Sequence, residues 1–197
     1  MSAIRLAETR DLPGIYRVCL QQGDSGGDAT ALFRNPDLLG HVYTGPFVVG
    51  EPDLAFVVAD ELGISGYALA CADVRTFNAW AEENWWPSLR AQYADADRTG
   101  ADGEIIDLFF SPPQARESVL ERYPAQMHID LDPRTRGHGY GRQLIQALIE
   151  RLRERDVHGL HLDVSTTNYN AIQFYEHLGF EELERTDGSV YMGKLLD

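Results

Sequence analysis

A strand, a glycine-rich turn and a helix follow one another in the second half of the chain, and this order constrains the fold most. The run Met127–Pro133 alternates apolar and polar residues, Arg136–Gly141 has glycine at every second position, and residues 142–155 are amphipathic. Glycines let backbone N–H groups turn toward a ligand, and a first helical turn adds unpaired N–H groups and a positive dipole end. Arg136 and Arg142 add fixed positive charge. The turn therefore predicts a site for a phosphorylated cofactor, with a purely structural turn as the alternative.

Hydrophobic periodicity and turn residues predict an α+β fold, with hairpins early and a strand–helix–strand–helix unit late. Strands are expected at 4–7, 54–59, 64–72, 125–132, 158–165, 180–185 and 189–194. Helices are expected at 9–22, 28–43 with a break at Pro36, 77–93, 111–121, 140–155 and 168–178. Residues 44–46 read as a turn and 95–103 as a loop, and Gly66 inside its strand suggests a bulge or a close backbone approach. We expect a single domain, 1–197, with an insertion at about 73–124.

Composition limits the partners that such a chain can have. Its 197 residues carry a formal net charge of −14, which argues against nucleic acid or an anionic membrane surface as the main partner. The two cysteines, Cys19 and Cys71, stand among apolar residues and are expected to be buried reduced thiols. We find no secretory signal and no apolar run long enough to span a membrane, so a cytoplasmic location is the expectation.

A second motif makes the glycine turn specific. The segment Asn168–Phe180 fits Asn-x-x-Ala-x-x-Phe-Tyr-x-x-x-Gly-Phe, and Arg136, Gly139 and Gly141 fit Arg/Gln-x-x-Gly-x-Gly/Ala. With the opening Ile4–Ile15, these motifs resemble those of the GNAT acetyltransferases across nearly the whole chain except about 73–124. The resemblance implies the GNAT fold, whose central twisted sheet is mixed, mostly antiparallel and flanked by helices.

A narrower resemblance lies within that family. The segment Tyr123–Pro133, together with Tyr43–Pro46 and Gly66–Ala68, is similar to the acetyltransferase-like C-terminal domains of the O-GlcNAc-removing glycosidases and their bacterial relatives. Here Arg136 and the glycines of the turn are all present, so the resemblance implies a chain that binds acetyl-CoA.

The family resemblance implies which residues contact acetyl-CoA. The backbone of the strand would pair with the pantetheine arm, the amides of the turn would hold the pyrophosphate, and Asn168 and Tyr175 would approach the cofactor. The implied cofactor-binding residues are Ile129, Asp130, Leu131, Arg136, Gly137, His138, Gly139, Tyr140, Gly141, Arg142, Asn168 and Tyr175.

Acyl transfer from a thioester to an amine needs a base for the nucleophile and an acid for the leaving thiolate. The resemblance implies Tyr175 as the acid, and a tyrosine has a pKa close enough to that of a thiol to return a proton to sulfur. For the base, His128, Asp130 and Asp132 alternate along one face of the strand. Asp130 is the first candidate, since it would lie beside the thioester. His128 and Asp132 are the other candidates on this face, and Glu104 and Asp107 are reserve candidates. The alternative is that Asp130 is an edge carboxylate in solvent or forms a salt bridge with an arginine.

The predicted activity is direct acetyl transfer from acetyl-CoA to a small amine or a peptide. The alternative is a catalytically silent module that binds acyl-CoA or another protein. Trp80, Trp85 and Trp86 of the insertion either line the acceptor site, pack the insertion onto the sheet, or form a contact in a homodimer. No metal site is expected, because His158 and His161 would face opposite sides of a strand. Asp130 and Asp132 would lie side by side, which is unsuitable for a glycosidase.

Overall fold

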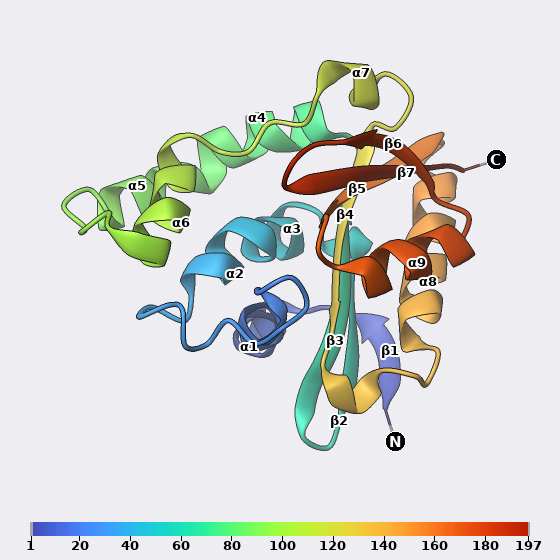
Figure 1. The fold of residues 1–197 in the computed structure, drawn as a ribbon, viewed down its shortest axis with the longest axis horizontal. Helices are drawn as coiled ribbons and strands as arrows, with labels where there is room; N and C mark the ends of the chain where they lie inside the picture. Colours follow the sequence, from blue (N-terminus) through green and yellow to red (C-terminus); the bar gives the residue numbers. More distant parts are fainter. Residues whose placement is uncertain (1, 197) are drawn as a thin grey trace.

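A seven-stranded sheet forms the centre of the computed structural model, which describes residues 2–196 (Figure 1). The strands are β1 (Ala3–Leu6), β2 (Ala55–Asp60), β3 (Gly63–Cys71), β4 (Ala125–Leu131), β5 (Gly159–Ser165), β6 (Glu181–Arg185) and β7 (Ser189–Leu195). Their order is β1-β2-β3-β4-β5-β7-β6, and every neighbouring pair is antiparallel except β4 and β5. The predicted fold class, a mixed and mostly antiparallel sheet flanked by helices, is confirmed.

Helices cover both faces of this sheet. They are α1 (Leu12–Gln22), α2 (Leu38–Tyr43), α3 (Gly45–Gly50), α4 (Val74–Asn84), α5 (Trp86–Gln92), α6 (Gly100–Phe110), α7 (Glu117–Leu120), α8 (Tyr140–Glu154) and α9 (Tyr169–His177), with 3-10 turns η1 (Thr9–Asp11), η2 (Pro52–Leu54) and η3 (Pro133–Thr135). One core lies between the sheet and α8 and α9, and a second between the sheet and α1 and α3. No helix within residues 2–196 is long and apolar enough to cross a membrane.

Strand alternation divides the side chains between the two cores. Met127 belongs to the α8 and α9 side, whereas Tyr67, on the neighbouring strand, belongs to the α1 side and contacts His128 and Asp130. The predicted amphipathic helix is also present, because α8 buries Leu144, Leu148 and Leu152 completely. Each such leucine contributes roughly 1.5–3 kcal/mol of transfer free energy.

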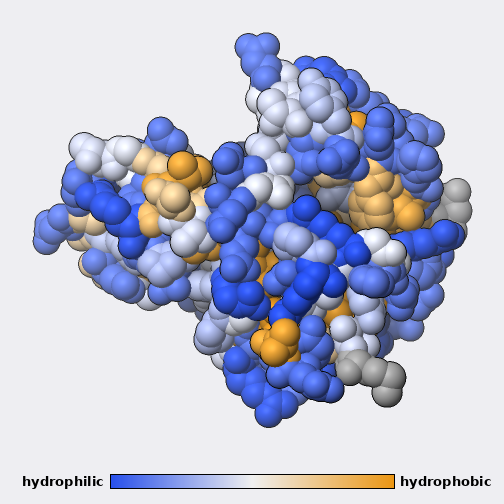
Figure 2. Space-filling model, turned by 60° about the horizontal axis from the view of Figure 1, so that its bottom comes forward, coloured by the Kyte–Doolittle hydropathy of each residue, from blue (hydrophilic) through white to orange (hydrophobic). Residues whose placement is uncertain are grey.

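The helices of the insertion form a lobe beside the sheet. In Figure 1, α4, α5 and α6 extend away from the strands, and they share a third core with α2. The face shown in Figure 2 is mostly hydrophilic, with apolar residues in separate patches, one of them on this lobe. This surface agrees with the net charge of −14.

Four predictions of local structure were wrong, and one of them is the helix expected at 111–121, of which only α7 (Glu117–Leu120) is helical. Residues 28–37 are not helical, because Asp28 and Asn35 side chains accept hydrogen bonds from the backbone N–H groups of Thr30 and Asp37, and such local bonds compete with a helix. Pro46 does not mark a turn: it lies in the first turn of α3, where its missing N–H costs nothing. The loop expected at 95–103 ends early, because α6 begins at Gly100.

The strands β4 and β5 separate after a short ladder, and this creates the space for a site. They pair only at Ala125 with Leu160 and at Gln126 with His161. From Met127 onward β4 continues its antiparallel ladder with β3, while its other edge is free of β5. A gap therefore opens in the middle of the sheet.

Gly66 lies where the backbone of β3 is irregular and crowded. The register between β2 and β3 shifts next to it, and a Cβ added at Gly66 would lie 2.4 Å from Leu131 Cδ2 and 3.2 Å from the Asp130 carbonyl oxygen. Both expectations for this glycine, a bulge and a close approach, are confirmed. The small residue at Gly66 lets β4 lie close to β3 beside the gap.

We expect Gly66→Val to destabilise the protein by about 1–3 kcal/mol, because the added methyl groups would overpack the contact with Leu131. Urea unfolding measures this change. Gly188→Val is the control, since nothing lies within 4 Å of a Cβ added at Gly188. Equal unfolding midpoints for the two variants would contradict the tight contact.

Candidate active site

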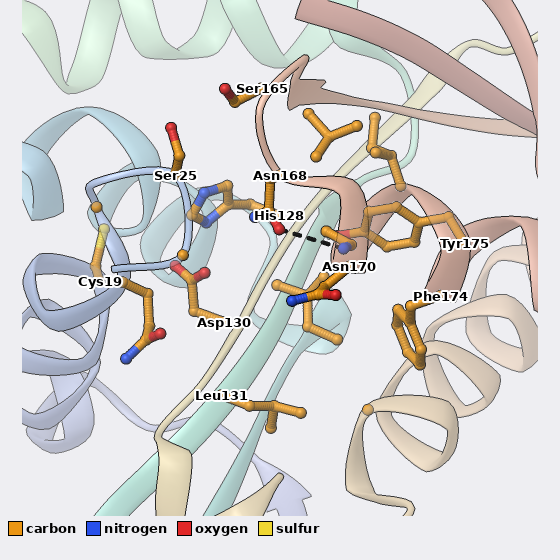
Figure 3. A pocket seen from close by; sticks show the side chains of 18 of the residues that line it. Cys19, Ser25, His128, Asp130, Leu131, Ser165, Asn168, Asn170, Phe174 and Tyr175 are labelled. Carbon is orange, nitrogen blue, oxygen red and sulfur yellow. Dashed lines mark hydrogen bonds between the residues drawn. The ribbon is translucent and has the colours of Figure 1, made fainter. Parts of the chain in front are cut away.

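A cavity of about 870 Å³ passes through the gap between β4 and β5. It is lined from both faces of the sheet: Cys19 and Tyr43 come from the α1 side, and Phe174 and Tyr175 from the α8 and α9 side. In Figure 3, His128 and Asp130 lie on one side of β4, and Phe174 and Tyr175 lie on the other. The cavity can therefore receive two molecules from opposite faces and bring them together at the gap.

The predicted glycine turn forms one end of this cavity. Gly137 and Gly139 have φ of +77° and +80°, a backbone region that other residues rarely adopt, and Gly139 is the N-cap of α8. Within residues 2–196, none of the backbone N–H groups of residues 137–142 has an acceptor. A row of unpaired N–H groups at a helix N-terminus is an anion-binding arrangement.

Gly141 brings the first turn of α8 against the neighbouring elements. A Cβ added there would lie 3.0 Å from Phe174 Cζ and 3.2 Å from Leu131 Cδ1. A glycine is therefore favoured at Gly141, because a larger residue would crowd the close contact between α8, α9 and the end of β4.

The arginines of the turn have different environments. Arg136 donates to the carbonyl oxygens of Leu131 (3.1 Å) and Gly26 (3.3 Å) and to the side-chain oxygen of Gln22, all of them neutral acceptors. Arg142 lines the cavity, and no carboxylate within residues 2–196 pairs with Arg136 or Arg142. Arg134, by contrast, is paired with Asp60 and Asp132. Arg136 and Arg142 thus bring two positive charges to this end of an acidic chain.

Asn168 and Tyr175 both reach the cavity from α9. Asn168 is the N-cap, and its side-chain oxygen accepts a hydrogen bond from Ala171 N at 3.2 Å (Figure 3). Tyr175 packs against Phe174 and Phe180, at ring-centroid distances of 5.5 and 5.8 Å. Burial raises the pKa of Tyr175 above its ordinary value, so the hydroxyl is a proton donor at neutral pH.

Asp130 is held by a residue that the sequence did not single out for chemistry. The β3–β4 register places Tyr67 opposite Asp130, and the Tyr67 hydroxyl donates to Asp130 Oδ2 at 2.5 Å. The same hydroxyl lies 3.1 Å from His128 Nδ1, and since its proton is given to Asp130, Nδ1–H donates to the Tyr67 oxygen. The His128 ring also stacks on Tyr43, with centroids 5.8 Å apart.

Burial is the main influence on the Asp130 carboxyl, and it raises the pKa of this group. The electrostatic interaction with His128, the hydrogen bond from Tyr67 and the charge of Arg136 act in the opposite direction and lower this pKa. A carboxylate with a raised pKa is better suited to accept a proton than a solvated one.

The other carboxylates considered as bases do not line the cavity. Asp132 caps η3, because its side chain accepts a hydrogen bond from Arg134 N at 3.0 Å. Asp132 also forms an ion pair with Arg17. Glu104 is exposed on α6, and Asp107 on the same helix pairs with Arg98. His128 and Asp130 are the base candidates that the structure brings to the cavity.

All of the predicted cofactor-binding residues except His138 line the cavity; His138 is exposed in the turn. The tryptophans of the insertion do not line it. Trp86 stacks on Phe109, and Trp85 Nε1 donates to the His41 carbonyl oxygen at 2.9 Å. Trp85 and Trp86 therefore pack in the core that the lobe shares with α2, rather than onto the sheet or into the cavity. Sequence reasoning missed Phe33, Leu39 and Ile105, which do line the cavity.

Two smaller expectations concern cysteine and histidine. Cys19 and Cys71 are buried and unpaired with each other, as predicted. His161 is buried, and its Nδ1 lies 2.7 Å from the Tyr123 carbonyl oxygen, to which it donates. Within residues 2–196, no cluster of three or more His, Cys, Asp or Glu residues is arranged to hold a metal ion.

The comparisons with known proteins place this fold in one family of transferases. A family model described as "Acetyltransferase (GNAT) family" matches residues 94–180. The crystal structure of SsHAT is 31% identical, covers 100% of this chain and 98% of that one, and superposes with a TM-score of 0.92. The chain belongs to the GNAT acetyltransferase family.

The chain is also similar to two curated proteins, over different shares of their lengths. Protein O-GlcNAcase of Rattus norvegicus is 26% identical over 183 residues, which is 91% of this chain but 20% of that protein. This chain thus spans about a fifth of that relative's length. The [Ribosomal protein bS18]-alanine N-acetyltransferase of Escherichia coli strain K12 is 44% identical over 103 residues, which is 52% of this chain and 65% of that enzyme.

Proposed function

We propose that this chain transfers the acetyl group of acetyl-CoA directly to an amine. The observation that carries the proposal is the row of unpaired N–H groups at residues 137–142, which opens into the cavity that also contains Tyr175 and Asp130. Membership of the GNAT family supports acetyl-CoA as the cofactor.

The residues of the cavity suit the pyrophosphate and the pantetheine arm of this cofactor. The amides of residues 137–142, with Arg136 and Arg142, would hold the pyrophosphate. The free edge of β4 at Ile129–Leu131 would pair with the amides of the pantetheine arm, as an added strand does. Asn168, at the start of α9, would contact the same arm.

Bound acetyl-CoA would supply a thioester carbonyl that an amine can attack. In this proposal Asp130 takes a proton from the attacking amine, because its raised pKa makes it a better base than a solvated carboxylate. The Tyr67 hydroxyl occupies one oxygen of Asp130, which fixes the carboxylate in place. Tyr175 gives a proton to the sulfur when the C–S bond breaks and the C–N bond has formed. A backbone N–H of β4 would stabilise the developing oxyanion.

Arg142→Gln tests the cofactor site. We expect this variant to weaken acetyl-CoA binding about tenfold to hundredfold, because a charge-assisted hydrogen bond to phosphate contributes about 1.5–3 kcal/mol. Isothermal titration calorimetry measures the dissociation constant. Arg151→Gln is the control, since Arg151 lies in the last turns of the same helix and pairs with Glu154.

The same titration separates the proposal from its rivals. An absence of heat and of any thermal shift with the unmodified chain would refute acetyl-CoA binding. Binding without release of CoA thiol over a panel of amines would instead indicate a silent acyl-CoA-binding module.

A further inference from the structure

His128 is held between two aromatic rings on the same face of β4 as Asp130 (Figure 3). Its ring stacks on Tyr43 and on Tyr67, with centroids 5.8 and 5.7 Å away and interplanar angles of 21° and 23°. The hydrogen bond between Nδ1 and the Tyr67 oxygen, at 3.1 Å, fixes which edge of the ring faces the protein. His128 thus has a fixed orientation although it lines a cavity.

The atoms of His128 and Asp130 that point away from Tyr67 are open to the cavity. The Tyr67 hydroxyl contacts Nδ1 of His128 and Oδ2 of Asp130, whereas Nε2 and Oδ1 have no hydrogen-bond partner within residues 2–196. In that range the buried side-chain polar atom without a partner is His161 Nε2, so neither of these two atoms is buried. Both residues line the cavity and are half-buried. A molecule in the cavity can therefore contact Nε2 and Oδ1.

The hydrogen bonds determine which nitrogen of His128 can accept a proton. Because Tyr67 gives its proton to Asp130, Nδ1 carries a hydrogen, and Nε2 of the neutral ring has the free lone pair. A proton taken up at Nε2 would make the ring positive, and the Asp130 carboxylate would compensate this charge through the Tyr67 hydroxyl. A carboxylate supports a histidine base in the same way in a catalytic triad, although there the two groups are in direct contact.

An amine acceptor has two protons to lose. An aliphatic amine is an ammonium ion at neutral pH and has no lone pair for attack, so one proton must leave before the C–N bond forms. A second proton must leave the nitrogen once it is bonded to the carbonyl carbon. The proposed function assigns one proton to Asp130. A carboxylate accepts a single proton, so the other proton needs a second acceptor.

We propose that His128 is a second catalytic base, whose Nε2 takes the first proton from the ammonium group and releases it to solvent. This inference rests on the proposed function and adds a residue to it. The side chains of His128 and Asp130 converge, since both contact one hydroxyl oxygen, and an ammonium group has three hydrogens to give to Nε2 and Oδ1 together.

The two bases would act in order. After Nε2 has taken the first proton, the neutral amine attacks the thioester carbonyl carbon and the C–N bond forms. Asp130 takes the second proton from the nitrogen, the C–S bond breaks with its electron pair on sulfur, and Tyr175 gives its proton to the sulfur. The proton on Asp130 returns to Tyr175 through solvent. Each turnover then releases the thiol, the amide and the one proton that passed through His128.

The surroundings of His128 favour it as the open base. Burial raises the pKa of both tyrosines that stack on it and of the nearby thiol, so these three groups stay protonated at neutral pH. Asp163 is exposed on β5 and lines the same cavity, where its negative charge also attracts an ammonium ion. The titratable and charged side chains around His128 and its partners are Cys19, Tyr43, Tyr67, Asp130, Arg136 and Asp163.

Two small amines separate the two bases. Propylamine is an ammonium ion at pH 7, whereas the fluorine atoms of 2,2,2-trifluoroethylamine withdraw electrons and leave that amine largely neutral. His128→Asn keeps an N–H for Tyr67, and we expect it to lower kcat/KM for propylamine about 10²-fold but to change kcat/KM for trifluoroethylamine little. Asp130→Asn should lower both. An equal loss for both amines in His128→Asn would overturn the proposal while leaving acetyl transfer intact.

The pH dependence distinguishes a base from a structural role. The loss in His128→Asn should shrink as pH rises from 7 to 9, for propylamine and for any other aliphatic amine that the chain acetylates, because a growing share of the amine is already neutral. The control is His158→Asn, since His158 is exposed and does not line the cavity. A loss that stays constant over this range would contradict the proposal.

Nitrogen NMR of the chain with isotope-labelled histidine gives a readout that needs neither acetyl-CoA nor an amine. We expect a hydrogen on Nδ1 and a bare Nε2 for His128 at pH 8, with the signal assigned by its absence in His128→Asn. Tyr67→Phe should shift the hydrogen toward Nε2, because it removes the oxygen that holds Nδ1–H. A hydrogen on Nε2 in the unmodified chain would overturn the proposal by itself, whatever the outcome for acetyl transfer. A chain with a bare Nε2 that acetylates no amine would refute the proposed function, and with it the catalytic role of His128.

Discussion

Asp130→Asn is expected to lower kcat/KM for amine acetylation by about 10²–10³-fold, within the range attributed to a positioned general base. The substitution keeps the size of the side chain, and the amide oxygen can still accept the hydrogen bond from Tyr67. It removes the group that takes the proton and the negative charge that holds an ammonium. The wild-type rate should rise with pH as Asp130 ionises above its raised pKa, and the variant should lose this rise.

The same substitution should stabilise the fold. The pKa of Asp130 is raised by burial, so the folded chain binds this proton more tightly than the unfolded chain does. The free energy of unfolding therefore falls as pH rises from the ordinary aspartate pKa through the raised pKa of Asp130. Above the raised pKa, the buried negative charge of Asp130 destabilises the folded chain, and asparagine carries no such charge. Urea unfolding at neutral pH should give a higher free energy of unfolding for Asp130→Asn. A variant that is fully active, or less stable than the wild type, would contradict this account of the site.

Local patterns were sufficient to predict the geometry at the end of the cavity to which the proposed function assigns the cofactor. The positive φ values of Gly137 and Gly139 and the tight contact at Gly141 follow from a glycine turn between a strand and a helix, which is a short-range signal. Asn168 and Tyr175 lie on one amphipathic helix, so their shared position at the cavity also follows from a local pattern.

The α1 side of the cavity depends on contacts that no local pattern contains. Tyr67 reaches Asp130 because the β3–β4 register pairs them, and these residues are 63 positions apart in sequence. Phe33 lies in a loop shaped by side-chain-to-backbone hydrogen bonds, and Ile105 on a helix whose packing is set by α2. The tryptophans suggested an acceptor site in the sequence because they are large and aromatic, but they pack in the core of the lobe.

Tyr175→Phe should reduce kcat about 10²-fold and leave the dissociation constant of acetyl-CoA nearly unchanged. The substitution removes a hydroxyl that is the proposed proton donor to the leaving thiolate, and it keeps the ring that packs on Phe174 and Phe180. Because the pKa of Tyr175 is raised, the hydroxyl remains protonated through the neutral range, so the wild-type rate should show no loss of this acid near pH 7–9.

The control for this variant is Tyr169→Phe, the same change at the start of the same helix, where the side chain is 70% exposed. Stopped-flow measurement of thiol release at saturating acetyl-CoA separates the chemical step from binding. Equal kcat in the two variants would show that the thiolate leaves without help from Tyr175. The acid would then have to come from solvent.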